Sequence, residues 1–202
     1  MRQIKATLFI SADGVVEAPD QWHFPYFNDE MGVAVDRVMG PGKTDTLIIG
    51  RATYDSFAGA WPDRKEEGDG FAKHLGDCRK VVVSRQPLEF TWRNSELLEG
   101  DLVEGVAALK NEAGDKHIAI SGSPSVVRQL LEADLLDELH LLVHPIAIRK
   151  GKKLFDEGGE PIPLKVLSST TFENGVLDLV YGPAEALGET TYEDIKERLG
   201  KD

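Results

Sequence analysis

The sequence predicts an α/β fold with a mostly parallel central sheet, helices on both faces of the sheet and an antiparallel hairpin at its C-terminal end. Two patterns carry this prediction. Between Lys116 and Phe155, an apolar run is followed by a glycine turn, an amphipathic segment and a second apolar run. This is the strand–helix–strand order of a parallel crossover. Further along, Asn174-Gly175 separates two β-rich runs, which is a strong hairpin signal.

Three short apolar runs in the first half of the chain are typical of buried parallel strands. Such strands are covered on both faces and therefore lack the alternation of half-exposed ones. We expect them over Ile4–Ile10, Thr46–Ile49 and Lys80–Val83, with helices over Asp29–Met39 and Phe71–Leu75 and a solvated loop or flap over Ala60–Gly70.

Capping residues place two helices in the second half. Asp101 with Glu104 predicts a capping box that opens one of them. Ser123 is a suitable N-cap for the other, and Pro124 at the first helical position loses only an N–H that has no partner there. The strands of this half are expected over Glu96–Leu98, His117–Ile120, Leu139–Ile148, Leu164–Phe172 and Val176–Tyr181.

The chain divides into one domain and a short extension. No linker-like composition interrupts residues 1–182, which we interpret as a single domain. Residues 183–202 differ in character, and a helix is expected over Thr191–Leu199 with Tyr192, Ile195 and Leu199 on one face. This helix would dock on the domain or on a second subunit.

The composition limits the possible partners. The chain has 202 residues, with 23 Lys and Arg against 35 Asp and Glu, and a net charge of −12. This excess of negative charge disfavours nucleic acids and anionic membranes as partners. Cys78 is the only cysteine, which excludes an intrachain disulfide. The sequence shows neither a signal peptide nor a run long enough to cross a membrane, so we expect a cytoplasmic protein.

Phosphate-binding groups follow three of the predicted strands. The carboxyl ends of parallel strands meet at one edge of a sheet, where ligands bind, and arginine matches phosphate oxygens. Two arginines and a helix N-terminus suit a dinucleotide with an extra phosphate, hence NADPH rather than NADH. Taken alone, Gly122 is better explained as the residue of a tight turn, because the full G-x-G-x-x-G pattern is absent. The candidate cofactor-binding residues are Gly50, Arg51, Thr53, Ser84, Arg85, Gly122, Ser123 and Ser125.

An aromatic segment follows the first strand. It either lines a small-molecule pocket or covers the edge of the core. Asp13, in the turn before it, either forms that turn or presents a polar group to a substrate, and we name it as the candidate catalytic residue. The candidate substrate-pocket residues are Gly14, Trp22, Phe24, Tyr26 and Phe27.

The histidines do not predict a metal site. On a strand, His140 and His144 would share a face but lie about 13 Å apart at about 3.3 Å per residue, too far for one ion. His23 could donate a proton, although an exposed loop histidine without a role is the simpler interpretation.

The sequence resembles the dihydrofolate reductase-like superfamily. Within it, the chain is most similar to the reductase domain at the C-terminus of bifunctional riboflavin-biosynthesis deaminase-reductases and to its stand-alone relatives. The resemblance extends from Ile4 to Tyr181, and its main pieces are SADG, LIIGRATYDSF, VVVSR, GKKLF and the run ISGSPSVVRQLLEADLLDELHLLVHPIAI.

This resemblance implies a three-layer fold and an NADPH-dependent reductase that transfers a hydride to a small substrate. The substrate would be a pterin- or flavin-precursor-like heterocycle or a carbonyl compound, and the protein would be a homodimer. Arg51 and Thr53 would contact cofactor phosphates, Ser84 and Arg85 the adenosine end, and Gly122, Ser123 and Ser125 the pyrophosphate. Asp13 and Gly14 would lie near the nicotinamide and the substrate.

Two departures from the family pattern leave an alternative open. Many relatives carry Gly-Gly where this chain has Gly122-Ser123, and the sequence offers no clear proton donor. The deaminase half is absent, because its H-x-E and P-C-x-x-C motifs do not occur. The alternative is a non-catalytic dimer on the same scaffold that binds a nucleotide or a pterin-like ligand.

Overall fold

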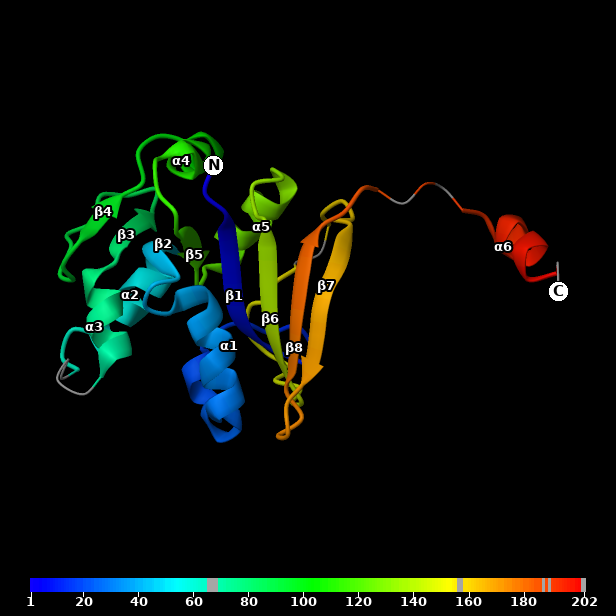
Figure 1. Cartoon of the computed structure of the whole chain (residues 1–202), viewed down its shortest axis with the longest axis horizontal. Helices are drawn as coiled ribbons and strands as arrows, with labels where there is room; N and C mark the ends of the chain where they lie inside the picture. Colours follow the sequence, from blue (N-terminus) through cyan, green and yellow to red (C-terminus); the bar gives the residue numbers. More distant parts are fainter. Residues whose placement is uncertain (65–68, 156–157, 187, 189, 201–202) are drawn as a thin grey trace.

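The computed structural model describes residues 1–64, 69–155, 158–186, 188 and 190–200. Eight strands form one sheet in the order β4-β3-β2-β5-β1-β6-β8-β7 (Figure 1). The strands are β1 (Ile4–Ser11), β2 (Thr44–Gly50), β3 (Arg79–Val83), β4 (Ser95–Leu97), β5 (His117–Ile120), β6 (Glu138–His144), β7 (Leu164–Thr171) and β8 (Leu177–Pro183). The α-helices are α1 (Asp29–Met39), α2 (Arg51–Ala60), α3 (Gly70–Asp77), α4 (Leu102–Asn111), α5 (Pro124–Glu132) and α6 (Tyr192–Leu199).

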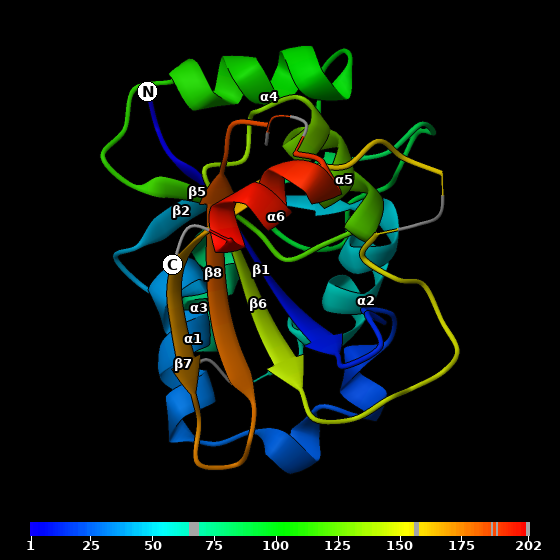
Figure 2. The same cartoon turned by 90° about the vertical axis from the view of Figure 1, so that its right-hand side faces the viewer.

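The predicted α/β fold is confirmed. Strands β1 to β6 pair in parallel, and the β7–β8 hairpin joins β6 in antiparallel register. Helices α4 and α5 pack on one face of the sheet, around Val106 and Val127, while α1, α2 and α3 cover the other. Figure 2 views the sheet from the hairpin edge, with α1 on one side and α5 on the other. The central strands of the sheet are thus buried between two helical layers.

The structure corrects three details of the predicted elements. The strand predicted over Leu139–Ile148 ends at His144, because the chain then turns so that Ile146 accepts a hydrogen bond from the Ala12 amide. Helix α4 begins with a simple N-cap, in which Asp101 accepts from the Val103 amide at 2.9 Å, rather than with the predicted capping box. Of the loop predicted over residues 60–70, residues 65–68 lie outside the described part of the chain.

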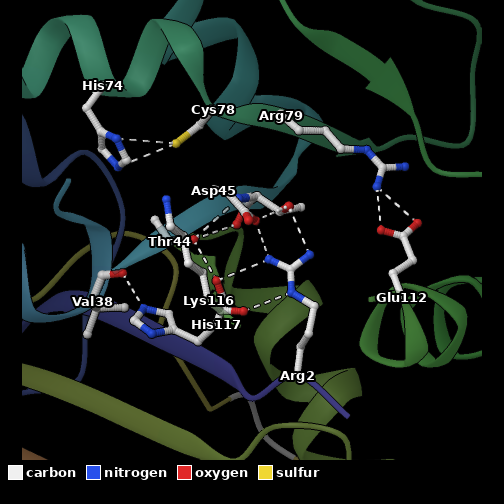
Figure 3. Close-up of polar contacts among 11 residues, drawn as sticks. Arg2, Val38, Thr44, Asp45, His74, Cys78, Arg79, Glu112, Lys116 and His117 are labelled. Atoms are coloured by element: carbon white, nitrogen blue, oxygen red, sulfur yellow. Dashed lines mark hydrogen bonds and ion pairs between the residues drawn. The ribbon is translucent and has the colours of Figure 1, made fainter. Parts of the chain in front are cut away.

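A polar network ties together the amino ends of β1, β2 and β5 (Figure 3). The side chain of Arg2 is only 4% exposed and forms an ion pair with Asp45. Its Nε donates to the backbone carbonyl of Lys116 at 2.9 Å, and Thr44 Oγ1 donates to that of His117 at the same distance. The Arg2 guanidinium and these two backbone carbonyls therefore find their partners within the protein.

The C-terminal helix α6 lies away from the sheet (Figure 1). A capping box between Thr191 and Asp194 begins it. Tyr192 and Leu199 are 77% and 76% exposed, and Ile195 is 44% exposed. The predicted helix is present, but its apolar face has no cover within the described chain. In the described residues, none of the helices is both long and apolar enough to span a bilayer.

Replacing Arg2 with methionine tests the network at the amino ends of the strands. The change keeps an apolar stem but removes the donor to the part-buried carbonyl of Lys116 and one of the two donors to Asp45, which also accepts from Thr46. We expect the free energy of unfolding, measured in urea, to fall by about 2–3 kcal/mol. Arg79→Met is the matched control, because Arg79 is 40% exposed and pairs with carboxylates at the surface, where ion pairs contribute about 0–1 kcal/mol. Equal losses in the two variants would contradict this account.

Candidate functional site

A cavity of about 2210 Å³ opens along the carboxyl ends of β1, β2, β3 and β5. These strands are neighbours in the sheet, so the segments that follow them meet at one edge. In open parallel sheets this edge is where ligands bind. The cavity has a cationic end, formed by the segments after β2, β3 and β5, and an aromatic end beside β1.

Two strand–helix turns meet at the cationic end. The Gly50 amide donates to the carbonyl of Gly122 at 3.2 Å. A Cβ atom at Gly50 would lie 2.4 Å from Ser123 Oγ, and one at Gly122, where φ is +117°, would lie 2.9 Å from Thr53 Oγ1. Only glycine therefore allows the turn before α2 and the turn before α5 to come this close.

The approach of the two turns places the N-termini of α2 and α5 side by side. Neither N-cap residue, Gly50 or Ser123, caps its helix with a side-chain hydrogen bond. The Ser123 and Ser125 hydroxyls instead lie 3.0 Å apart at the start of α5. Uncapped amides and the two helix dipoles make this end of the cavity a favourable place for an anion.

Two arginines add positive charge there. Arg51 uses its Nε to bind Asp55, at 2.8 and 3.0 Å, and its two terminal nitrogens remain available. Arg85 is exposed on the cavity wall and has no ion-pair partner among the described residues. Ser84 precedes it and donates to the carbonyl of Gln86 at 2.8 Å.

The structure brings the candidate cofactor-binding residues together. Seven of the eight line the cavity, and Gly50 lies directly behind Ser123. The seven lining residues are Arg51, Thr53, Ser84, Arg85, Gly122, Ser123 and Ser125.

Of the five candidate substrate-pocket residues, two line the cavity and three do not. Phe24 and Phe27 line the aromatic end and are 60% and 50% exposed. Trp22 is buried away from the cavity, where its Nε1 donates to the carbonyl of Glu17 at 3.1 Å. Tyr26 packs edge-on against the ring of His144, and Gly14 forms a turn with φ of +87°. The expectation that Trp22, Tyr26 and Gly14 line the pocket is therefore not met, because the segment uses them to cover the core.

Asp13 holds two loops together. Its carboxylate accepts from Ser11 Oγ at 2.7 Å and from the amides of Ile148 and Arg149 at 2.9 and 2.8 Å. The hydrogen bond from Ser11, with those from the two amides, lowers the pKa of Asp13 to about 2. Because such a carboxylate is ionised at neutral pH and has no proton to give, the contacts favour a turn-former among the two interpretations of this residue.

Sequence reasoning missed the position of His23. The expectation of an exposed loop histidine is wrong, since His23 is only 6% exposed and lies on the cavity wall. Its ring stacks on Phe9, with centroids 4.2 Å apart. Burial, together with the nearby His144, lowers its pKa to about 4. The only signal in the sequence was its place within the aromatic segment.

Basic residues from the chain after β6 also reach the cavity. Lys152 and Lys153 line it, as does Arg128 of α5, which donates to the carbonyl of Leu154 at 2.8 Å. An antiparallel bridge between Val15 and Lys153 holds this segment in place. Within the described residues, no group of three histidine, cysteine or acidic side chains is arranged to hold a metal ion.

Comparisons with known proteins agree with this geometry. Residues 2–177 match the model of the RibD C-terminal domain family. A Bacillus subtilis (strain 168) protein called uncharacterized protein YyaP is 28% identical over 187 residues, which cover 89% of this chain and 94% of that protein.

Solved structures show the same fold. A putative riboflavin biosynthesis protein from Shewanella sp. PV-4 superposes with a TM-score of 0.66 at 20% identity, covering 91% of this chain and 99% of the other. Dihydrofolate reductase from Enterococcus faecalis, in complex with NADP(H) and RAB-propyl, gives a TM-score of 0.62 at 17% identity, with 91% of this chain and 97% of the other covered.

The contact between the two turns can be tested with alanine. In Gly122→Ala, a side chain in a left-handed conformation meets Thr53, and we expect a loss of about 1–3 kcal/mol in the free energy of unfolding. Gly59→Ala in α2 is the control, because a Cβ there meets nothing within 4 Å. Alanine at that position should stabilise the helix by about 0.5–1 kcal/mol. Urea titration measures both changes, and an unchanged midpoint for Gly122→Ala would show that the turns can separate freely.

The histidines predict acid sensitivity. Burial lowers the pKa of all five, which are His23, His74, His117, His140 and His144. Below a pH of about 6.5 the unfolded chain therefore binds more protons than the folded one, so the free energy of unfolding should fall as the pH falls. For His23 this window extends down to a pH of about 4. His23→Phe should make the decline shallower in urea titrations between these values, whereas an unchanged slope would contradict the assignment.

Proposed function

Because the chain belongs to the RibD C-terminal domain family, whose fold neighbours include a reductase, we propose that it is an NADPH-dependent reductase. It transfers a hydride to a small heterocyclic substrate, of the pterin- or flavin-precursor-like kind, or to a carbonyl compound. The observation that carries this proposal is the single cavity, in which two uncapped helix N-termini and two arginines adjoin an aromatic wall.

The cationic end fits a nucleotide with an additional phosphate. The amides at the N-termini of α2 and α5 suit the pyrophosphate, and the absence of a side chain at Gly122 gives the backbone close access. Arg51 and Arg85 then provide two separate guanidinium groups. A dinucleotide without the 2′-phosphate would leave one of them without an anion, so we expect NADPH to bind better than NADH.

The aromatic end fits the reacting partners. NADPH, when bound, supplies the hydride. Phe24 and Phe27 present apolar surface against which a flat ring can pack, and they exclude water from it. The contribution of the chain is thus to orient the two partners and to keep the site dry, since the cofactor carries the chemistry.

A specific observation keeps a second function open. The carboxylate of Asp13, the candidate catalytic residue, is held ionised by three hydrogen bonds and does not line the cavity. If no other group supplies a proton, the same cavity would belong to a protein that binds a nucleotide or a pterin-like ligand without turnover.

We also propose that the protein is a homodimer, whose interface must lie on exposed apolar surface. Strand β6 cannot provide it, because it is paired with β1 and β8 inside the sheet. The exposed apolar surface lies instead on α6 and on the edge strand β7, where Val166 and Leu167 are 56% and 51% exposed. Such surfaces are typical of association between subunits.

Cofactor binding can be measured by titration calorimetry with NADPH and NADH. We expect NADPH to bind more tightly, and Arg51→Ala/Arg85→Ala to weaken its binding by a factor of about 100 or more, since each charged contact contributes about 1.5–3 kcal/mol. Arg79→Ala is the matched control, because Arg79 lies at the opposite, amino end of β3. An NADPH affinity that the double variant leaves unchanged would refute the cofactor assignment.

A turnover assay distinguishes the reductase from the non-catalytic binding protein. The loss of NADPH absorbance in the near ultraviolet should be observed with at least one compound from a panel of pterins, flavin precursors and ketones. Tight NADPH binding without oxidation across the whole panel would favour the non-catalytic protein.

The dimer can be tested by analytical ultracentrifugation. Tyr192→Ser/Leu199→Ser removes two exposed apolar side chains of α6 and should shift the full-length chain towards a monomer. Glu193→Ser/Glu197→Ser changes the charged side of the same helix and should leave the dimer intact. A monomeric wild-type chain would exclude the proposed dimer.

A further inference from the structure

The proposed reaction gives no role to His23. It lies on the wall of the cavity, at the aromatic end, and is nevertheless 6% exposed. A polar side chain that is nine-tenths buried normally has its hydrogen bonds satisfied by the protein. None of the described residues forms a hydrogen bond to this ring, and its Nδ1 is sealed from solvent without a partner.

The orientation of the ring is fixed by its neighbours. The imidazole lies between Phe9, with centroids 4.2 Å apart and planes at 14°, and Phe24, at 4.3 Å and 36°. Phe27 and His144 approach it edge-on at 6.0 and 6.2 Å. Because both faces are covered by phenyl rings, only the edge of the imidazole remains for a polar contact.

The ring is neutral, and its tautomer follows from burial. Desolvation and the nearby His144 lower the pKa of His23 to about 4, so one nitrogen carries hydrogen and the other is bare at neutral pH. A buried N–H without a partner is rarer than a buried bare acceptor, which assigns the hydrogen to Nε2. His144 carries its hydrogen on Nδ1, which donates to the carbonyl of Leu142 at 2.8 Å.

We propose that His23 is the specificity-determining residue of the substrate end, and that its Nε2–H donates a hydrogen bond to an acceptor on the edge of a planar heteroaromatic ring. The inference rests on the proposed function and narrows it, because it selects the heterocycle among the substrate classes. Phe24 and Phe27, which line the same end, offer the faces on which such a ring stacks. A ligand must then combine a flat π surface with an acceptor at its edge.

The energetics favour this selection. A hydrocarbon ring of the same size would stack equally well but would leave the imidazole N–H buried and unpaired, at a cost of about 1–3 kcal/mol. Sites built to hydrogen-bond a substrate reject analogues that lack the group for this reason. An aliphatic carbonyl compound would satisfy the donor but forgo the stacking with the phenyl rings.

Two variants test the hydrogen-bond donor and the flat ring of His23 separately. His23→Phe keeps a flat ring between Phe9 and Phe24 and removes the donor, whereas His23→Gln removes the ring and keeps an N–H near the position of Nε2. The probes are lumazine, a flat heterocycle with carbonyl and ring-nitrogen acceptors, and naphthalene, which has none. Binding is followed by quenching of probe fluorescence in the full-length protein, and near-ultraviolet circular dichroism checks the packing of each variant.

We expect wild-type protein to bind lumazine in preference to naphthalene. His23→Phe should weaken lumazine binding about tenfold or more and leave naphthalene binding unchanged, and His23→Gln should retain lumazine binding within about threefold. The proposal is overturned if wild-type protein does not bind lumazine, if His23→Phe binds it as tightly as wild type, or if both variants lose the same affinity.

A spectroscopic measurement tests the tautomer independently. In protein labelled with ¹⁵N-histidine, the resonances of His23 should show a neutral ring with hydrogen on Nε2, and lumazine should shift the Nε2 resonance. Hydrogen on Nδ1 would overturn the assignment. NADPH calorimetry on the same variants should show unchanged affinity for NADPH. If the wild-type protein binds lumazine through His23 but does not bind NADPH, the proposed reductase is refuted and the role of His23 in ligand binding is not.

Discussion

The close approach of two strand–helix turns is the constraint on which the rest of the site depends. Gly50 and Gly122 are in direct backbone contact, and a side chain on either one would collide with Ser123 or Thr53. This contact sets the distance between the N-termini of α2 and α5, and it does so at the centre of the sheet, where β2 and β5 are neighbours. The absence of a side chain at two glycines thus determines how far apart the two helix N-termini lie in the cavity.

The same edge of the sheet explains how an acidic protein can bind an anion. The net charge of −12 is an average over the surface, whereas Arg51 and Arg85 lie together on one cavity with two helix N-termini. The segment after β1 then adds an aromatic end, which Asp13 stabilises by fixing the loop against the chain after β6. A cationic end and an aromatic end in one cavity are the features expected of a site for two different ligand groups.

The fold and the cationic end could be predicted from the sequence because they depend on local patterns. The carboxyl ends of three parallel strands place Arg51, Ser84 and Gly122 at one sheet edge without any knowledge of their contacts. The aromatic end could not be predicted in the same way. Whether Trp22 or Phe24 faces the cavity depends on how an irregular segment packs, and irregular backbone has no periodicity from which to infer a face. The burial of His23 depends on Phe9, on a strand that precedes it by a turn and a loop.

The contacts of the buried cations could not be predicted from the sequence either. They also distinguish the amino ends of the strands from the carboxyl ends, where the cavity lies. Lys80 is fully buried and donates to the carbonyls of Leu75, Gly76 and Cys78 at 2.7–2.9 Å, which caps the C-terminus of α3. Together with Arg2, it satisfies polar groups at the amino ends of the strands. At the carboxyl ends, by contrast, helix N-termini stay uncapped and His23 keeps an unpaired nitrogen. Because an uncapped helix N-terminus and a buried unpaired nitrogen both cost stability, their retention beside one cavity is an argument that a ligand completes them.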